Sequence, residues 1–390
     1  MRPRRSTAAP LFPLVCGVVV VVTAAAGCRS RARTPAPSDT PAAPTDTVPS
    51  DTAVYNLNAR IDLLETQLRT PGQSGTREAQ GRRDLLIGLL MTRAQTLGHF
   101  GDYDRALELA EAGGRERPDD PAALVTRARV REHLHLFTEA LADLDTAEAR
   151  GAPATSTETV RAAIFAATGR DAEAAQLLAR HNAAHPDLYS LGAEAIGAAR
   201  AGDMARAEAL FSKARAAYRD VSPFPPAWLD FQQGRVWHDR GDLARARPFY
   251  EAARVRVPEY AAAVAHFAEV ESAAGPDGRA RAIALLRPLV TTSDDPEYVG
   301  DLSQLLAADG QDPAEAARLR TVAERGYERL LARHRAAFLD HAARFWLGPG
   351  ADPVRAAGLA EENAALRPTA EARALLASTR AASARASAPP

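Results

Sequence analysis

The chain has almost no cysteine and almost no lysine. Only two of its 390 residues are cysteine, Cys16 and Cys28, and both lie close to its start. Cys16 falls inside an apolar leader that we expect to be removed, so the mature chain would keep a single thiol, which excludes disulfides and thiolate metal sites. Lys213 is the single lysine, and the other basic residues of the chain are arginines.

A net charge is missing as well. The formal charge at pH 7 is −1, whereas a domain that binds nucleic acid through its phosphates is strongly basic. The arginines are interspersed with aspartate and glutamate and form no basic run or tail. We therefore expect no nucleic-acid partner.

Patterns typical of β-strands are hard to find after residue 56. Hydrophobic residues make up 46% of the chain, alanine is the commonest of them, and glycine and proline fall mainly where turns are expected. This composition predicts an all-α protein with a thin, continuous core.

A glycine followed five residues later by an alanine recurs along the chain at intervals of about 34 residues or their double, and a period of this length is typical of a helix-turn-helix unit. The pairs are Gly101/Ala106, Gly169/Ala174, Gly202/Ala207 and Gly241/Ala246. One such unit cannot bury its apolar face alone and must stack on a neighbour. The sequence predicts an α-solenoid of stacked helical hairpins.

The clearest unit spans residues 227–259, where small and aromatic residues alternate in a fixed order. These residues are Gly234, Trp237, Gly241, Ala246, Tyr250, Ala253 and Pro258. The order resembles that of the tetratricopeptide repeat (TPR). We expect Gly234 and Ala246 to let the two helices of the hairpin approach closely, while Trp237 and Tyr250 fill the space beside them.

The same register divides most of the chain into units. They begin near Ile87, Pro121, Thr155, Leu188, Ala227, Ala261 and Pro296, and a degenerate unit spans residues 337–368. Residues 221–226 stretch the fourth unit, and residues 275–278 lie in the turn of the sixth. We predict a capping helix and loop over 56–80, a repeat array of seven to eight TPR-like units over 87–368, and a capping helix and disordered tail over 369–390, the tail beginning at Ala381.

The first 27 residues have the features of an export signal. Arginines precede an apolar run that ends in small residues directly before Cys28, and this resembles the lipobox of bacterial lipoproteins. The resemblance implies that Cys28 is acylated and becomes the first residue of a palmitate-bearing lipoprotein. An ordinary signal peptide cleaved near Ala26 and an uncleaved membrane anchor are the alternatives.

Residues 28–55 are rich in proline, threonine, serine and alanine, so we predict a disordered linker from the lipid to the first helix. With a lipidated Cys28 this places the chain in the bacterial cell envelope, on the periplasmic side of the outer membrane by the sorting rule that Arg29 fits.

No constellation for catalysis is visible. His181 and His185 have the spacing of metal ligands on a helix, but Asn182 stands where a zinc protease has glutamate, and a solvated helix end is the simpler interpretation. Nucleophile, phosphate-binding and dinucleotide motifs are missing. We predict a protein that is not an enzyme, with no cofactor and no metal ligand; a metal-binding or hydrolytic protein that uses its histidine-bearing helices is the alternative.

The TPR resemblance also implies a binding surface, because the first helices of successive units line a concave groove in that family. Its groove positions carry over to Trp228, Phe231, Arg235, His238, Tyr189, Glu269, Arg129, Glu132 and Gln304, and more loosely to Arg200. Trp228 and Phe231 have a second interpretation, in which they pack beneath the insertion that contains Phe224. The predicted function is a scaffold that binds a protein or peptide partner, in envelope assembly, secretion or polysaccharide export; the alternative is a spacer without a ligand.

Labelling with palmitate tests the lipid anchor. The wild-type chain should incorporate labelled palmitate when it is produced in a bacterium that processes lipoproteins, and the Cys28→Ser variant should incorporate none, because the acylated thiol is lost. Equal incorporation into both proteins would rule out Cys28 as the acylated residue.

Overall fold

The computed structural model of the chain describes residues 47–69, 76–310 and 312–387. The predicted signal peptide, Cys28 and most of the predicted linker lie outside the described residues. Within the described ranges the chain forms seventeen helices and no strand, which confirms the all-α prediction. None of these helices combines the length and the apolar character that a membrane span needs.

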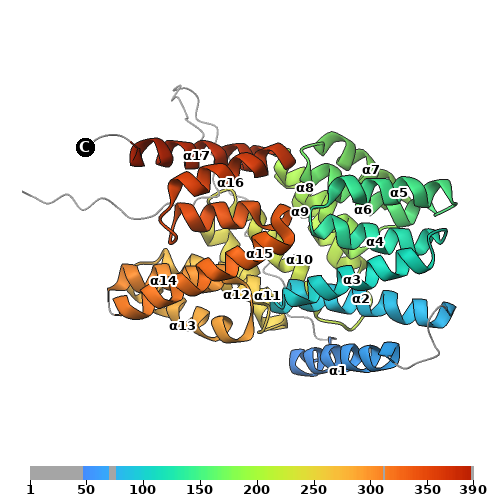
Figure 1. Ribbon diagram of the computed structural model, residues 1–390, viewed down its shortest axis with the longest axis horizontal. Helices are drawn as coiled ribbons and strands as arrows, with labels where there is room; N and C mark the ends of the chain where they lie inside the picture. The colour runs from blue at the N-terminus through green and yellow to red at the C-terminus, as the bar shows by residue number, and fades with distance from the viewer. Residues whose placement is uncertain (1–46, 70–75, 311, 388–390) are drawn as a thin grey trace, which may run out of the picture.

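The helices follow one another with short connections (Figure 1). They are α1 (Ser50–Arg69), α2 (Arg77–Leu97), α3 (Gly101–Glu116), α4 (Pro121–His133), α5 (Phe137–Ala149), α6 (Ala154–Ala167), α7 (Asp171–Ala184), α8 (Leu188–Arg200), α9 (Met204–Ala217), α10 (Phe224–His238), α11 (Leu243–Arg256), α12 (Ala261–Ser272), α13 (Pro276–Thr292), α14 (Pro296–Asp309), α15 (Pro313–Leu347), α16 (Pro353–Leu366) and α17 (Ala370–Ala386).

Consecutive helices pack as hairpins, from α2 with α3 to α12 with α13. The long helix α15 serves two hairpins, because its backbone leaves helical geometry at His334, with φ −132° and ψ 48°. The part before this kink belongs with α14, and the part after it belongs with α16. The described residues therefore form eight hairpins, with α1 packed on α2 and α17 packed on α15 and α16 at the two ends.

Both ends of the array depart from the prediction. Helix α1 begins at Ser50, inside the segment predicted as linker, because Ala53 extends the buried face of Leu57 by one turn. Helix α2 begins at Arg77, where the hydroxyl of Thr76 accepts a hydrogen bond from the first turn. At the other end α17 continues to Ala386, past the start of the predicted disordered tail, because its alanines and arginines favour a helix.

The two helices of a hairpin approach closely through small residues. The repeated alanines of the second helices, Ala106, Ala174, Ala207 and Ala246, are at most 4% exposed. In the fifth unit Gly234 of α10 lies against the ring of Tyr250, which is fully buried on α11. This is the interlocking of small and aromatic residues that the sequence predicts.

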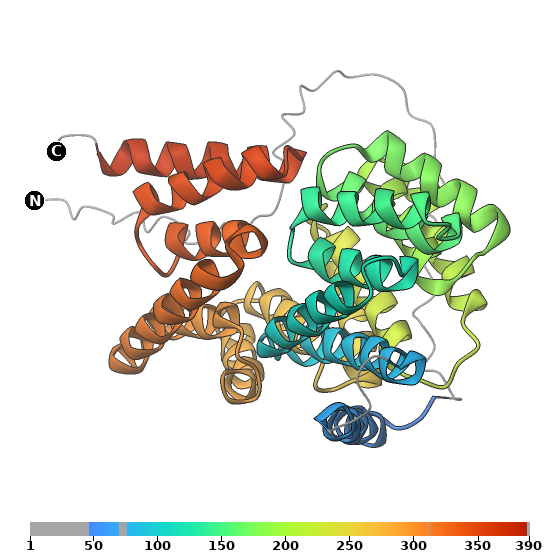
Figure 2. The ribbon, with the colours of Figure 1, turned by 45° about the vertical axis from the view of Figure 1, so that its right-hand side comes forward.

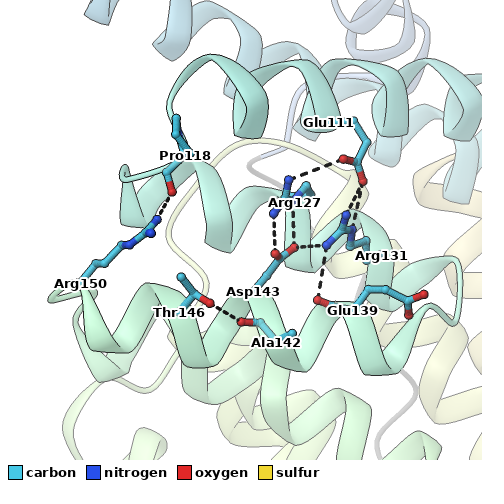
Figure 3. Close-up of polar contacts among 9 residues, drawn as sticks. All are labelled: Glu111, Pro118, Arg127, Arg131, Glu139, Ala142, Asp143, Thr146 and Arg150. Atoms are coloured by element: carbon cyan, nitrogen blue, oxygen red, sulfur yellow. Dashed lines mark hydrogen bonds and ion pairs between the residues drawn. The ribbon is translucent and has the colours of Figure 1, made fainter.

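Neighbouring units are also joined by buried carboxylates that each bind two arginines. Asp143 accepts hydrogen bonds from Arg127 at 2.6 Å and from Arg131 at 2.7 Å, and Arg131 reaches on to Glu111 of the preceding unit at 2.6 Å (Figure 3). Two further carboxylates follow the same pattern: Asp230 with Arg215 and Arg256, and Glu271 with Arg247 and Arg281. These arginines thus serve the internal packing of the array, since a planar guanidinium can bind several acceptors at once.

The solenoid completes a turn, so that its first units meet its last. Asp104 of α3 lies 2.7 Å from Nε2 of His334 on α15, and the rings of Phe100 and Phe338 are 5.3 Å apart. The carbonyl of Gly98 accepts hydrogen bonds from the Ser293 hydroxyl and the Asp294 amide, which follow α13. Figures 1 and 2 show α2 and α3 beside the later helices, drawn in yellow and orange.

Replacing Gly234 by alanine tests the close approach within the fifth hairpin. The new methyl group would lie 2.7 Å from ring atoms of Tyr250, so we expect a loss of about 1–3 kcal/mol of stability from overpacking. Gly197→Ala on α8 is the control, because nothing lies within 4 Å of its added methyl group, and it should stabilise the chain by about 0.4–1 kcal/mol. Urea unfolding midpoints measure both; a Gly234→Ala protein as resistant as the control would contradict the packing described.

Candidate binding surface on the inner helices

The first helices of the hairpins face the inside of the turn. Neighbours along this wall contact one another from α2 through α4, α6 and α8 to α10, and α2 also contacts α10 and α12. These helices therefore surround the side chains that point toward the inside of the turn. They still touch water, as the 37% and 43% exposed side chains of Glu297 and His341 show.

Three of the predicted groove residues come together on this wall, namely Arg235, His238 and Glu269. We call these residues and those that contact them from the facing inner helices the inner cluster. His238 is the last residue of α10, and its Nε2 lies 3.7 Å from a carboxylate oxygen of Glu269 on α12. Arg235 lies one turn before His238 and is exposed. Burial lowers the pKa of His238 and outweighs the charge of Glu269, which raises it. His238 therefore favours its neutral form.

The predicted aromatic anchors separate into a core residue and a surface pair. Phe231 is 6% exposed, lies 5.2 Å from the ring of Tyr260 and belongs to the same cluster as Phe224, so it is a packing residue and not a partner anchor. Trp228 is half-buried and packs 5.0 Å from the ring of Tyr189, which is 52% exposed. This pair presents a partly exposed aromatic surface on α8 and α10.

Arg200 does not join these residues. It is exposed at the end of α8, and its guanidinium lies 4.0 Å from the carboxylate of Asp171 on α7. With Asp171 it lines a hollow of about 190 Å³ between α6, α7 and α8. Arg200 matches a groove position only loosely in the sequence, and in the structure it lies outside the inner cluster.

The structure adds four residues to the inner cluster that the sequence analysis did not select: His266, Glu297, Asp301 and His341. Nδ1 of His266 lies 3.1 Å from a carboxylate oxygen of Glu269, and Nδ1 of His341 lies 2.9 Å from one of Glu297. Glu297 occupies the second position of the seventh unit, so the repeat register could have found it. His341 occupies the fifth position of the last unit, which starts at Ala337, so the register could have found it as well. His266 and Asp301 lie at the sixth positions of their units, outside the groove positions that the TPR resemblance implies.

Two further carboxylates lie close to Glu297 in this cluster, where His341, His266 and Arg344 are the cationic groups that act on Glu297. Burial raises the pKa of Asp301 well above its ordinary value, and the charges of Glu297 and Glu269 add to the rise. Burial likewise raises the pKa of Asp295, at the start of α14, to about 7, again with a contribution from Glu297. Burial is the main cause of both shifts, and the neighbouring carboxylates of α12 and α14 add to it.

Glu297 itself is held in its charged form by His341. Burial alone would raise the pKa of Glu297, but the charge and hydrogen bond of His341 outweigh it and lower this pKa to about 2. Burial would lower the pKa of His341, but Glu297 and Asp340 raise it to about 9. The two side chains form an ion pair at neutral pH.

The histidines with metal-ligand spacing in the sequence have other surroundings. His181 is buried, 3.6 Å from Glu158 and 3.7 Å from Asp187, so the expected solvated helix end is wrong. It does not join His185 in any set of three potential metal ligands among the described residues. His135 contacts the carbonyl of Ala336 at 3.0 Å and thereby helps to close the turn.

No family model matches the chain, and no curated protein matches it in sequence. Solved structures do share its fold. The human IFIT1 dimer with m7Gppp-AAAA is 15% identical, with a TM-score of 0.50 over 85% of this chain and 77% of that chain. The APC/C hetero-tetramer Cut9–Hcn1 is 13% identical, with a TM-score of 0.47 over 83% of this chain and 59% of that chain.

A tetratricopeptide repeat protein from Parabacteroides merdae is 15% identical, with a TM-score of 0.38 over 76% of this chain and 98% of its own. The fold is that of a TPR solenoid. At these identities the likeness concerns the fold alone, and the chain spans less than two thirds of the matched Cut9–Hcn1 chain. The carboxylates on the inner wall are a feature of this chain, and they are not inferred from the compared structures.

The ion pair between His341 and Glu297 predicts an unusual histidine titration. The NMR signal of the His341 ring should titrate near pH 9, well above the ordinary 6.5, because Glu297 and Asp340 stabilise its charged form. The pair's contribution to stability should be complete below pH 6.5 and lost as the pH rises through about 9, since the folded chain holds this proton more tightly than the unfolded chain.

Glu297→Gln should move this titration back toward the ordinary value, and His341→Gln assigns the signal by removing it. A His341 that titrates near pH 6.5 in the wild-type protein would contradict the ion pair.

Proposed function

We propose that this TPR solenoid is a non-enzymatic, lipid-tethered scaffold of the cell envelope that binds an extended, basic segment of a partner protein along its inner wall. The repeat array supports a protein-interaction role, because stacked hairpins present a long surface with no chemistry of their own. Envelope assembly, secretion and polysaccharide export are the processes that this role would fit.

The acidic cluster on α12 and α14 is the observation that carries the choice of partner. Glu269, Glu297 and Asp301 lie in one enclosed region, where burial raises the pKa of Asp301 and the charges of Glu297 and Glu269 add to the rise. A cationic side chain from a partner would relieve this repulsion and hold Asp301 in its charged form. The partially exposed rings of Tyr189 and Trp228, on the neighbouring inner helices, would hold an apolar or aromatic side chain of the same segment.

The same charges argue against a nucleic-acid ligand. IFIT1 is named with a capped oligonucleotide in its solved structure. A phosphate backbone in the groove of the present chain would face the carboxylates of α12 and α14, which repel it. The inner wall thus favours a ligand of the opposite charge.

The tether rests on the sequence around Cys28. Helix α1 begins at Ser50 and packs on the outside of α2, where Figure 1 shows it at the edge of the array.

Binding of model peptides tests the proposal. With chelator present to exclude metal ions, the full-length chain in detergent should bind an oligo-arginine peptide and not an oligo-glutamate peptide of the same length. The double variant Glu297→Gln/Asp301→Asn should bind oligo-arginine at least about tenfold more weakly, equivalent to about 1.4 kcal/mol. Fluorescence anisotropy of the labelled peptides gives both affinities.

The matched control is Glu361→Gln/Glu362→Gln, which replaces two carboxylates at exposed positions of α16. It should leave the affinity unchanged. Equal loss in both double variants would show a non-specific charge effect, and no binding by the wild-type chain would favour a spacer without a groove ligand.

A further inference from the structure

Two histidines and a glutamate converge on the inner wall at the spacing of metal ligands. His238 ends α10, while His266 and Glu269 lie one turn apart on α12. Nδ1 of His266 is 3.1 Å from one carboxylate oxygen of Glu269, and Nε2 of His238 is 3.7 Å from the other. One ligand atom from each residue lies within 4.8 Å of both others. A cation placed between them would reach all three with small side-chain adjustments.

The two imidazole rings are held in place by the aromatic core beneath them. Nδ1 of His238 lies 3.1 Å from the hydroxyl of Tyr250, which is fully buried. The ring of His266 stacks on the ring of Tyr250 at 5.5 Å and 17°, and its other neighbour is Phe231 at 5.4 Å. When Nδ1 of His238 donates to Tyr250, Nε2 keeps its lone pair toward Glu269. Such a hydrogen bond behind a histidine ligand orients the ring and fixes the tautomer.

The three donors leave part of the coordination sphere open to the interior of the turn. The side chains of His266 and Glu269 are 36% and 29% exposed, and that of His238 is 12% exposed. Water or a side chain of the bound partner can complete the sphere. Glu297 adds negative potential around Glu269, while Arg235 acts in the opposite direction on His238.

This is the one such set among the described residues. No other histidine of the described residues belongs to a set of three residues whose ligand atoms all lie within 4.8 Å of one another. Imidazole and carboxylate together suit zinc and its neighbours among the first-row transition metals, whereas magnesium and calcium prefer sites made of oxygen alone.

We propose that His238, His266 and Glu269 form a binding site for one divalent transition-metal ion of the zinc class, with an open position that faces the groove. The site joins the fifth unit to the sixth, so a bound ion would link two hairpins across the inner wall. It does not depend on the peptide ligand proposed above, and it is tested without that peptide.

The experiment titrates Co²⁺ and Zn²⁺ into the metal-free, full-length chain in detergent. One Co²⁺ per chain should bind with visible absorption bands typical of nitrogen and oxygen ligands, and one Zn²⁺ should displace it, while Mg²⁺ should not. His266→Gln and Glu269→Gln should each weaken Zn²⁺ binding at least about tenfold, since each removes one of only three ligands. Calorimetry gives the stoichiometry and the affinity.

Tyr250→Phe keeps the aromatic ring and removes only the hydroxyl behind His238. It should weaken Zn²⁺ binding about tenfold, a loss that a purely packing role of Tyr250 would not produce. His185→Gln, an exposed histidine on another face, is the control and should bind as the wild type does. Circular dichroism melting without metal identifies any variant that fails to fold. If another variant fails, the Zn²⁺ affinity of His266→Gln decides the test, because His266 is the most exposed of the three ligands and its replacement disturbs the packing least.

Wild-type binding that is not stoichiometric, or equal Zn²⁺ affinity in the wild-type, His266→Gln and Glu269→Gln proteins, would overturn the proposal. Retained affinity in Glu269→Gln alone would do so as well, because two histidines alone do not make the proposed site.

Discussion

The contact between Tyr250 and Gly234 is the one on which the inner wall depends. Only a residue without a side chain lets the tyrosine ring lie against α10, and the same ring then supports both histidines of the wall. Its hydroxyl faces His238 and its face stacks on His266. The interlocking that holds one hairpin together therefore also sets the position of the polar groups that point into the turn.

Closure of the turn gives these polar groups their electrostatic character. Because the first unit contacts the sixth and the eighth, the side chains of α12 and α14 are surrounded by protein while they remain in contact with water. Carboxylates in such surroundings cannot all ionise at no cost, which is why the pKa of Asp295 rises to about 7 while that of Glu297, paired with His341, falls. The buried arginine pairs between hairpins keep the units in register around this region.

Much of the fold could be predicted from the sequence because glycine, proline and alanine mark the ends and the close contacts of most units. Helices α4, α8, α12 and α14 begin at Pro121, Leu188, Ala261 and Pro296, the unit starts given by the register. The first unit was placed ten residues late because its start depends on Thr76, an N-cap that the repeat pattern does not contain. The kink at His334 separates the seventh unit from the eighth without any proline or glycine to mark it.

The site could be predicted only in part. Position in the repeat identified His238, Arg235 and Glu269, since neighbouring first helices place equivalent positions side by side. It also gives His341, at the fifth position of the last unit, but it does not show that His341 reaches Glu297 from another hairpin. It did not separate Phe231 from exposed groove residues, because burial depends on contacts with Tyr260 and His266. Contacts between residues of distant units produce no periodic pattern in the sequence, so the repeat register does not reveal them.

The central claim is that partners bind to the inner helices, and hydrogen exchange measured by mass spectrometry tests it most directly. Addition of the oligo-arginine peptide to the full-length chain should slow exchange in α10, α12 and α14 and leave the outer helices α11 and α13 unchanged. Protection confined to the outer helices, or none at saturating peptide, would contradict the account.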